Sequence, residues 1–170
     1  MIVLRCTQRL LKASGIKPVE ESPAPTAPLG EWYANIVSLP FRGRSLVVFV
    51  NGGTLLSVVA PGRVVGTTVP VFQRRLPHLL QRLDMPQAWI DEHMAGLSEV
   101  CFARTASRSV LGSKNDIARQ IWGDAESVRS FDQLDLDWLE ARLGEVPFGA
   151  LRYRSPIGAL AELVQPGSCT

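Results

Sequence analysis

The hydrophobic pattern of the sequence changes its period at Pro70, and this change constrains the fold more than any other feature. Before Pro70, apolar and β-branched residues form short runs of the kind found in strands. After Pro70, apolar residues recur every three or four positions, as on one face of a helix. The 170 residues correspond to about one domain. The sequence therefore predicts an α+β fold in which both halves share one unit.

The first half predicts a short meander of strands. Asn51-Gly52-Gly53 separates two β-branched runs, and turn positions with φ > 0 favour Asn and Gly, so this segment predicts a hairpin. A second turn is expected over residues 40–44. We therefore expect a small, mostly antiparallel sheet, with strands near residues 2–5, 32–39, 45–50, 54–60 and 99–103.

Helices are expected to cover this sheet. Thr7 is a candidate N-cap, and Ser113-Lys114-Asn115-Asp116 resembles a capping box that opens a helix. Pro77 is expected to kink or split the helix in which it lies. A Pro-rich surface loop is predicted at 18–30, within a single domain spanning 1–170. The helices are expected near residues 7–14, 70–83, 87–96, 114–122, 136–143 and 156–164.

Several classes of protein are excluded by the sequence. The longest apolar run has five residues, against about 20 for a membrane helix, and Arg5 and Arg9 interrupt any signal peptide. We therefore expect a cytoplasmic protein with no membrane partner. The three cysteines are odd in number and far apart, which argues against a disulfide framework. His78 and His93 lack the spacing of zinc ligands, so no metal and no cofactor are expected.

The net charge of +2 conceals an asymmetry between the two halves of the chain. Residues 32–83 contain six arginines and no Asp or Glu, whereas residues 124–145 contain seven acids and only two arginines. One interpretation is a cationic face for an anionic partner. The other, which we favour from the sequence, is that the two halves pair electrostatically in the folded protein.

One candidate site precedes the helix that the capping-box pattern predicts. Hydroxyls and cations lie between a predicted strand and a helix N-terminus, where free N–H groups favour phosphate or carboxylate. Arg108 and Lys114 would supply charge-assisted hydrogen bonds. In the structural alternative, Ser113 caps the helix and Arg108 is solvated. The candidate ligand-binding residues here are Ser107, Arg108, Ser109, Ser113, Lys114 and Asn115.

Two further groups of residues are candidates. Arg5 and Thr7 lie at another strand-to-helix transition and would line one pocket with Arg108 and Ser109 if the two transitions are adjacent. In the alternative, Thr7 caps the helix. The second group is a basic helix face that suits a phosphate backbone or an acidic protein partner, unless it is only solvated. This face comprises Arg74, Arg75, His78, Gln81 and Arg82.

Four segments carry a family resemblance. They are Arg5-Cys6-Thr7-Gln8-Arg9-Leu10-Leu11, Trp32-Tyr33-Ala34-Asn35, residues 108–116 and Pro147-Phe148-Gly149-Ala150-Leu151. Together they resemble the motifs of an uncharacterised bacterial family of small single-domain proteins, a domain of unknown function. The resemblance spans nearly the whole chain. It implies one complete unit, and it implies no activity, ligand or catalytic residue.

The preferred hypothesis is a non-enzymatic binding protein for an anionic ligand, either nucleic acid or a nucleotide. The first alternative is a metal-independent enzyme on a phosphorylated or nucleic-acid substrate. In this enzyme Arg5, Arg108 and Lys114 would stabilise negative charge, and His78 or a hydroxyl would perform acid–base chemistry. The second alternative is a partner-binding accessory protein that uses its charge polarity to dimerise head to tail. The sequence indicates no particular oligomeric state.

Overall fold

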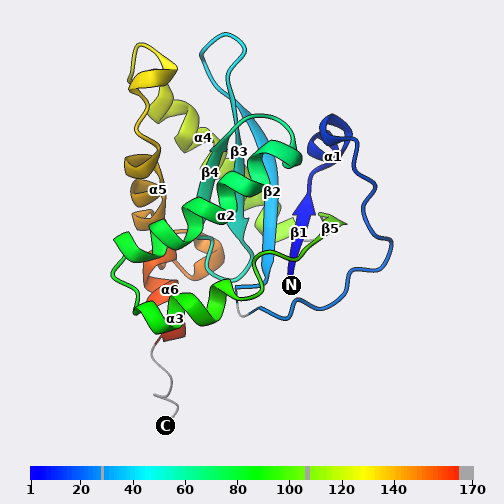
Figure 1. Cartoon of the computed structure of the whole chain (residues 1–170). Coiled ribbons are helices and arrows are strands. Elements are labelled where there is room, and N and C mark those ends of the chain that lie inside the picture. The colour runs from blue at the N-terminus through cyan, green and yellow to red at the C-terminus, as the bar shows by residue number, and fades with distance from the viewer. Residues whose placement is uncertain (28, 106–107, 165–170) are drawn as a thin grey trace.

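A five-stranded sheet forms the centre of the protein, with helices on both of its faces (Figure 1). The structure is a computed structural model that describes residues 1–27, 29–105 and 108–164. Its strands are β1 (Ile2–Cys6), β2 (Glu31–Ser38), β3 (Ser45–Asn51), β4 (Ser57–Pro61) and β5 (Val100–Arg104). This is the α+β class that the change of period predicts.

The sheet is mixed, so the prediction of a mostly antiparallel sheet is wrong. The strand order is β4-β3-β2-β1-β5. Strand β1 lies between β2 and β5 and is parallel to both, while β3 is antiparallel to β2 and β4. The predicted meander is therefore confirmed for β2, β3 and β4. The helical crossovers before β2 and β5 allow parallel pairing, which a tight hairpin cannot produce.

The turn between β3 and β4 lies where Asn51-Gly52-Gly53 predicts it. The side-chain oxygen of Asn51 accepts hydrogen bonds from the backbone N–H groups of Gly53, at 3.1 Å, and Thr54, at 3.0 Å. The residue with φ > 0 in this connection is Leu55, at 58°, and not either glycine. The loop is consequently longer than expected, and β4 begins at residue 57 and not at 54.

Each face of the sheet has its own hydrophobic core. On one face, α1 (Gln8–Ser14), α2 (Val65–Arg82) and α3 (Gln87–Met94) pack against Leu4, Trp32 and Phe49. On the other face, α4 (Arg108–Glu126) and α5 (Leu136–Glu145) pack against Val48 and Val59. The helix α6 (Pro156–Val164) and two single 3₁₀ turns, η1 (Phe131–Gln133) and η2 (Gly149–Leu151), complete the described elements.

Two helices begin well before their predicted starts. Helix α2 begins at Val65 and continues past Pro77, so the expected split at this proline is wrong. Seven of its side chains are buried, and this burial outweighs the helix-breaking cost of proline, about 3 kcal/mol.

Helix α4 begins at Arg108, six residues before the predicted start at Lys114. Ser113 and Asp116 therefore lie inside the helix, and the predicted capping box does not form. A glycine such as Gly112 inside a helix costs only about 1 kcal/mol and does not stop it. In the described residues, no helix is both long and apolar enough to cross a membrane.

Candidate site at the carboxyl ends of β1 and β5

Strands β1 and β5 end side by side, at the edge of the sheet from which α1 and α4 depart. Cys6 is paired with Arg104, and the backbone N–H of Thr105 donates to the carbonyl of Cys6 at 3.3 Å. Helix α1 then packs on one face of the sheet and α4 on the other. Adjacent parallel strands whose connections leave to opposite faces create a crevice, and ligands of open α/β sheets bind in such crevices. The two strand-to-helix transitions are thus adjacent.

Two cavities open at this edge and meet at residues 17–18 and 104–105. The first, of about 560 Å³, lies beside α1, and its lining includes Cys6, Lys12, Lys17 and Arg104 but no carboxylate. The second, of about 780 Å³, lies on the other side of these residues and is also lined by Arg5, Val19, Glu20 and Ser22. Both volumes fall in the range of small-molecule sites.

Lys114 is buried in the second turn of α4, behind this edge of the sheet. Only 3% of the residue is exposed, and its ammonium has no hydrogen-bond partner within the described residues. The Nζ atom lies 5.6 Å from the centroid of the Tyr33 ring on β2. A cation–π contact contributes about 0.5–2 kcal/mol, which is less than the several kcal/mol needed to bury a charge. Among the residues that the structure describes, the charge of Lys114 is therefore left uncompensated.

Burial also changes the protonation of Lys114 and Cys6. Loss of solvent lowers the pKa of Lys114 to about 8, and the nearby Cys6 opposes this shift in part. Burial raises the pKa of the Cys6 thiol to about 12, against the effect of the Lys114 charge. At neutral pH the site thus holds an ammonium and a neutral thiol. The hydroxyl of Thr105, whose Oγ1 atom is buried, likewise has no hydrogen-bond partner in the described structure.

The residues predicted at the β1 transition have other partners than expected. Thr7 is at the N-cap position of α1, but its side chain makes no capping hydrogen bond and donates to Oδ1 of Asn35 at 3.4 Å. Arg5 forms an ion pair with Glu31 on β2, with 2.5 Å between Nε and Oε1. Thr7 is therefore not the predicted side-chain cap, and the charge of Arg5 is balanced by Glu31.

The other predicted ligand-binding residues are distributed along α4. Ser113 is buried, whereas Asn115 is exposed. Ser107 lies outside the described residues, and the side chains of Arg108 and Ser109 do too. Of the predicted ligand-binding residues that the structure describes, few therefore lie together at this edge of the sheet. Arg5 and Thr7 lie at the end of β1, and Lys114 lies under β2.

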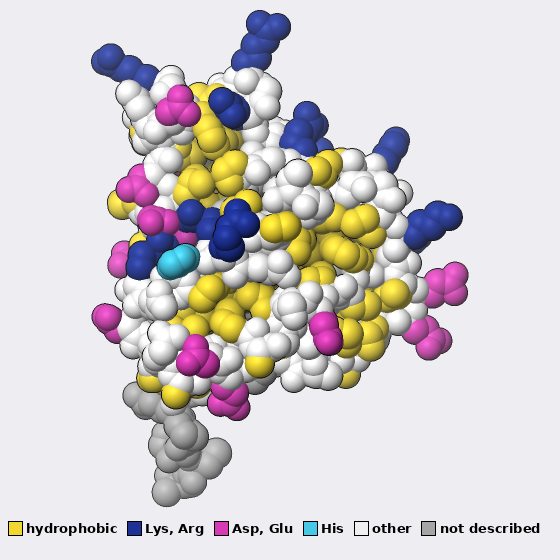
Figure 2. All heavy atoms as spheres, viewed as in Figure 1, with side chains coloured by type: hydrophobic (Ala, Val, Ile, Leu, Met, Phe, Trp, Pro, Cys, Tyr) yellow, Lys and Arg dark blue, Asp and Glu magenta, His cyan; other side chains and the backbone are white. Residues whose placement is uncertain are grey.

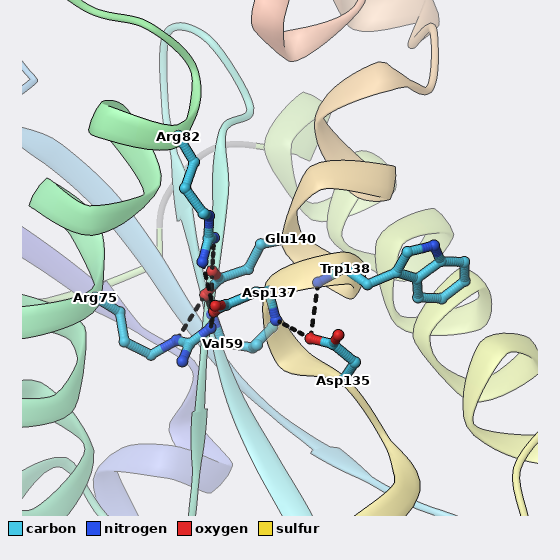
Figure 3. Close-up of polar contacts among 7 residues, drawn as sticks. All are labelled: Val59, Arg75, Arg82, Asp135, Asp137, Trp138 and Glu140. Carbon is cyan, nitrogen blue, oxygen red and sulfur yellow. Dashed lines mark hydrogen bonds and ion pairs between the residues drawn. The ribbon is translucent and has the colours of Figure 1, made fainter.

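The predicted basic face of α2 lies elsewhere and is largely neutralised by α5. Arg75 and Arg82 point toward Glu140 and Asp137, as Figure 3 shows. Arg75 donates from Nε and Nη2 to the two oxygens of Glu140 at 2.9 Å each, and Arg82 donates to Oε2 at 2.8 Å. Both arginines also pair with Asp137. The basic and acidic halves of the chain therefore meet here in ion pairs, as one interpretation of the charge asymmetry predicts.

Glu140 also closes an open edge of the sheet. Its side chain is fully buried, and Oε1 accepts a hydrogen bond at 3.0 Å from the backbone N–H of Val59 on the edge strand β4. An edge N–H without a partner would otherwise face the α2–α5 interface. Hydrogen bonds from Arg82 and Arg75 hold the pKa of Asp137 below its ordinary value, although partial burial opposes them. His78 is exposed and lines a hollow of about 420 Å³ beside this cluster.

The charged surface is polarised as well. Figure 2 shows Lys and Arg side chains projecting from the upper part of one face, with Asp and Glu along its left margin and lower part. Strand β1 points its carboxyl end toward the upper part in the same view (Figure 1), and β2 and β5 are parallel to it. In the described part of the chain, no group of three or more His, Cys, Asp or Glu side chains is placed to hold a metal ion.

The sequence pattern around the candidate sites includes Thr105 but does not single out Glu140 or Tyr33. Glu140 follows Leu136 by four residues and precedes Leu143 by three, so it lies on the apolar stripe of its helix. A carboxylate on such a stripe indicates a buried charge that needs a cation. Lys114 precedes Ile117 by three residues and Ile121 by seven, so it too lies on the apolar stripe of its helix. For Tyr33, the sequence alone carries no comparable indication, whereas Thr105 belongs to the segment of hydroxyls and cations that follows the predicted strand.

The sequence matches a protein-family model. A family model described as a domain of unknown function matches residues 3–159, which is nearly the whole chain. No curated protein matches the sequence significantly.

Proposed function

The chain belongs to the DUF6933 family, a domain of unknown function, and we propose that it binds a small phosphate-bearing anion of the nucleotide class. The proposed site is the crevice at the carboxyl ends of β1 and β5. The anion would contact Lys114 from the edge of the sheet, with Lys12, Lys17 and Arg104 at the rim. The sequence led us to expect either nucleic acid or a nucleotide as the anionic ligand, and this proposal selects the smaller of the two, which fits a cavity.

The observation that carries the proposal is the uncompensated ammonium of Lys114. Buried charges in proteins are normally paired or hydrogen-bonded, because an unpaired one costs several kcal/mol. A ligand phosphate would provide the missing negative charge and accept the hydrogen bonds that Lys114 does not make in the described structure. The position beside the ends of two parallel strands supports the same assignment.

The two cavities at this edge favour an anion over a neutral or cationic ligand; among the described residues Lys114 lines neither of them, and it is linked to the first through its electrostatic interaction with Cys6. Three cations and no carboxylate line the cavity of about 560 Å³. In the neighbouring cavity, Glu20 is the one acid among the lining residues. Neither described lining includes a histidine that would act as a general base, so we propose binding and not turnover. The cavity size favours a nucleotide or pyrophosphate over a nucleic-acid backbone.

Binding of pyrophosphate and of ATP tests this proposal. In calorimetric titrations at low salt, we expect both to bind near pH 7 and the affinity to fall as the pH rises through about 8, where Lys114 loses its proton. Arg104→Ala is expected to weaken binding about two- to five-fold, as for an exposed charge contact of about 0.5–1 kcal/mol.

Arg74→Ala is the matched control, because Arg74 is an exposed cation on α2 that lines neither cavity. Its affinity for pyrophosphate is expected to equal that of the unchanged protein. The absence of binding near pH 7 at low salt would overturn the proposal, and so would an affinity that stays constant between pH 7 and pH 10.

A further inference from the structure

A second concave surface lies at the same edge of the sheet. It lies at the end of β2 and the start of β3, whereas the crevice lies at the ends of β1 and β5. It is a shallow hollow of about 370 Å³ between the β2–β3 turn and helix α4. The part of its lining that the structure describes contains three arginines and an exposed tryptophan but no carboxylate. The lining residues are Ser38 to Ser45, Arg63 and Trp122.

Trp122 gives the hollow an aromatic surface. Its residue is 40% exposed, although large aromatic side chains usually bury most of their area. Beside it, the guanidinium of Arg44 lies 4.9 Å from the centroid of the Phe131 ring. Phe131 is in turn in edge-to-face contact with Phe41, with 6.5 Å between the ring centroids. These contacts orient one of the three cations.

The charges of the other two arginines are available to a ligand. Arg42 and Arg63 are exposed, and neither forms an ion pair within the described residues. This distinguishes the hollow from the α2–α5 interface, where the arginines form ion pairs with Glu140 and Asp137. Within the described residues, four arginines of the 32–83 segment form no ion pair, and three of them, Arg42, Arg44 and Arg63, lie around an exposed indole, whereas Arg74 lies on α2.

We propose that this hollow binds single-stranded nucleic acid. An unpaired base would stack on the indole of Trp122, and Arg42, Arg44 and Arg63 would contact the adjoining phosphates. Aromatic stacking together with a basic groove is the general mode of sequence-tolerant single-strand binding. An acidic peptide would satisfy the arginines but would leave the exposed indole without a stacking partner. The hollow shares no residue with the crevice beside Lys114.

Fluorescence anisotropy with labelled oligouridylate and oligothymidylate tests the proposal. We expect salt-sensitive binding of both by the full chain. Trp122→Ala is expected to weaken it by roughly 5- to 150-fold, which corresponds to one stacked base. Arg42→Ala and Arg63→Ala should each reduce the slope of log affinity against log salt by about 0.7.

Trp138→Ala is the matched control. Trp138 is also an exposed tryptophan, at 51%, but it lies on α5 and does not line the hollow. The control and Trp122→Ala should both keep the pyrophosphate binding of the unchanged protein, so failure at the hollow is distinguished from failure at the crevice.

Three results would overturn the inference. The first is no oligonucleotide binding at low salt, and the second is equal affinity of Trp122→Ala and Trp138→Ala. The third is a competitor that displaces the labelled oligonucleotide as effectively as oligouridylate does. If polyglutamate does so, the hollow binds an acidic protein; if duplex DNA does so, it contacts only the phosphate backbone. Unfolding curves of the variants confirm that each is folded under the binding conditions.

Discussion

Lys114→Met is expected to weaken pyrophosphate binding about 30- to 150-fold, which corresponds to the loss of a charge-assisted hydrogen bond of about 2–3 kcal/mol. Met retains the length of the buried side chain but carries no charge. The same substitution is expected to stabilise the free protein near pH 7 by about 1–3 kcal/mol, because it removes a buried ammonium without a carboxylate partner. Calorimetric titration and urea unfolding measure the two effects.

The stabilisation by Lys114→Met should depend on pH. The folded chain releases the Lys114 proton near pH 8, whereas the unfolded chain retains it to about 10.5. Between these values the folded state binds fewer protons, so the free energy of unfolding of the unchanged protein rises with pH. The advantage of the variant is therefore greatest below pH 8 and disappears above about pH 10.5. A variant that binds pyrophosphate normally, or that is destabilised throughout this range, contradicts this account.

Glu140→Ala is expected to lower the free energy of unfolding by about 3 kcal/mol. The substitution leaves Arg75 and Arg82 facing each other at the α2–α5 interface and removes the acceptor of the Val59 N–H. Breaking a buried ion pair costs about 3–5 kcal/mol, and the partial exposure of both arginines reduces that figure. Urea unfolding at neutral pH measures this loss. The expected fall in melting temperature is about 6–12 °C.

Asp137→Ala serves as the control for Glu140→Ala. Asp137 pairs with the same two arginines, but its side chain is 56% exposed. Exposed ion pairs contribute about 0–1 kcal/mol, so the loss of stability should stay below about 1 kcal/mol. Equal effects of the two substitutions would show that Glu140 does not hold α5 to the edge of the sheet in the manner described.

The periodicity of the sequence predicts the helices and strands well but not the arrangement of the strands. The local pattern around Asn51 identifies the β2–β3–β4 meander, because a hairpin is set by its turn and by flanking residues. By contrast, nothing within Ile2–Cys6 indicates that this strand lies between β2 and β5. Parallel pairing depends on the packing of the crossover helices, which involves residues far apart in the sequence.

The candidate site was partly predictable for a similar reason. The sequence indicates two strand-to-helix transitions rich in hydroxyls and cations, and the sheet order makes them adjacent. Ion pairing decided which cations are already neutralised. Glu31 forms an ion pair with Arg5, and Glu140 forms ion pairs with Arg75 and Arg82. These partners come from other elements of the fold, so their pairing follows from the three-dimensional structure alone.

The most direct test of the central claim is the pKa of Lys114 with and without ligand. An NMR titration that follows the Lys114 Cε resonance should give a pKa of about 8 in the free protein. In saturating pyrophosphate, the account predicts a rise toward the ordinary value of 10.5, because a bound anion stabilises the charged amine. A pKa of Lys114 that is the same with and without saturating pyrophosphate would contradict the proposal that this residue binds phosphate.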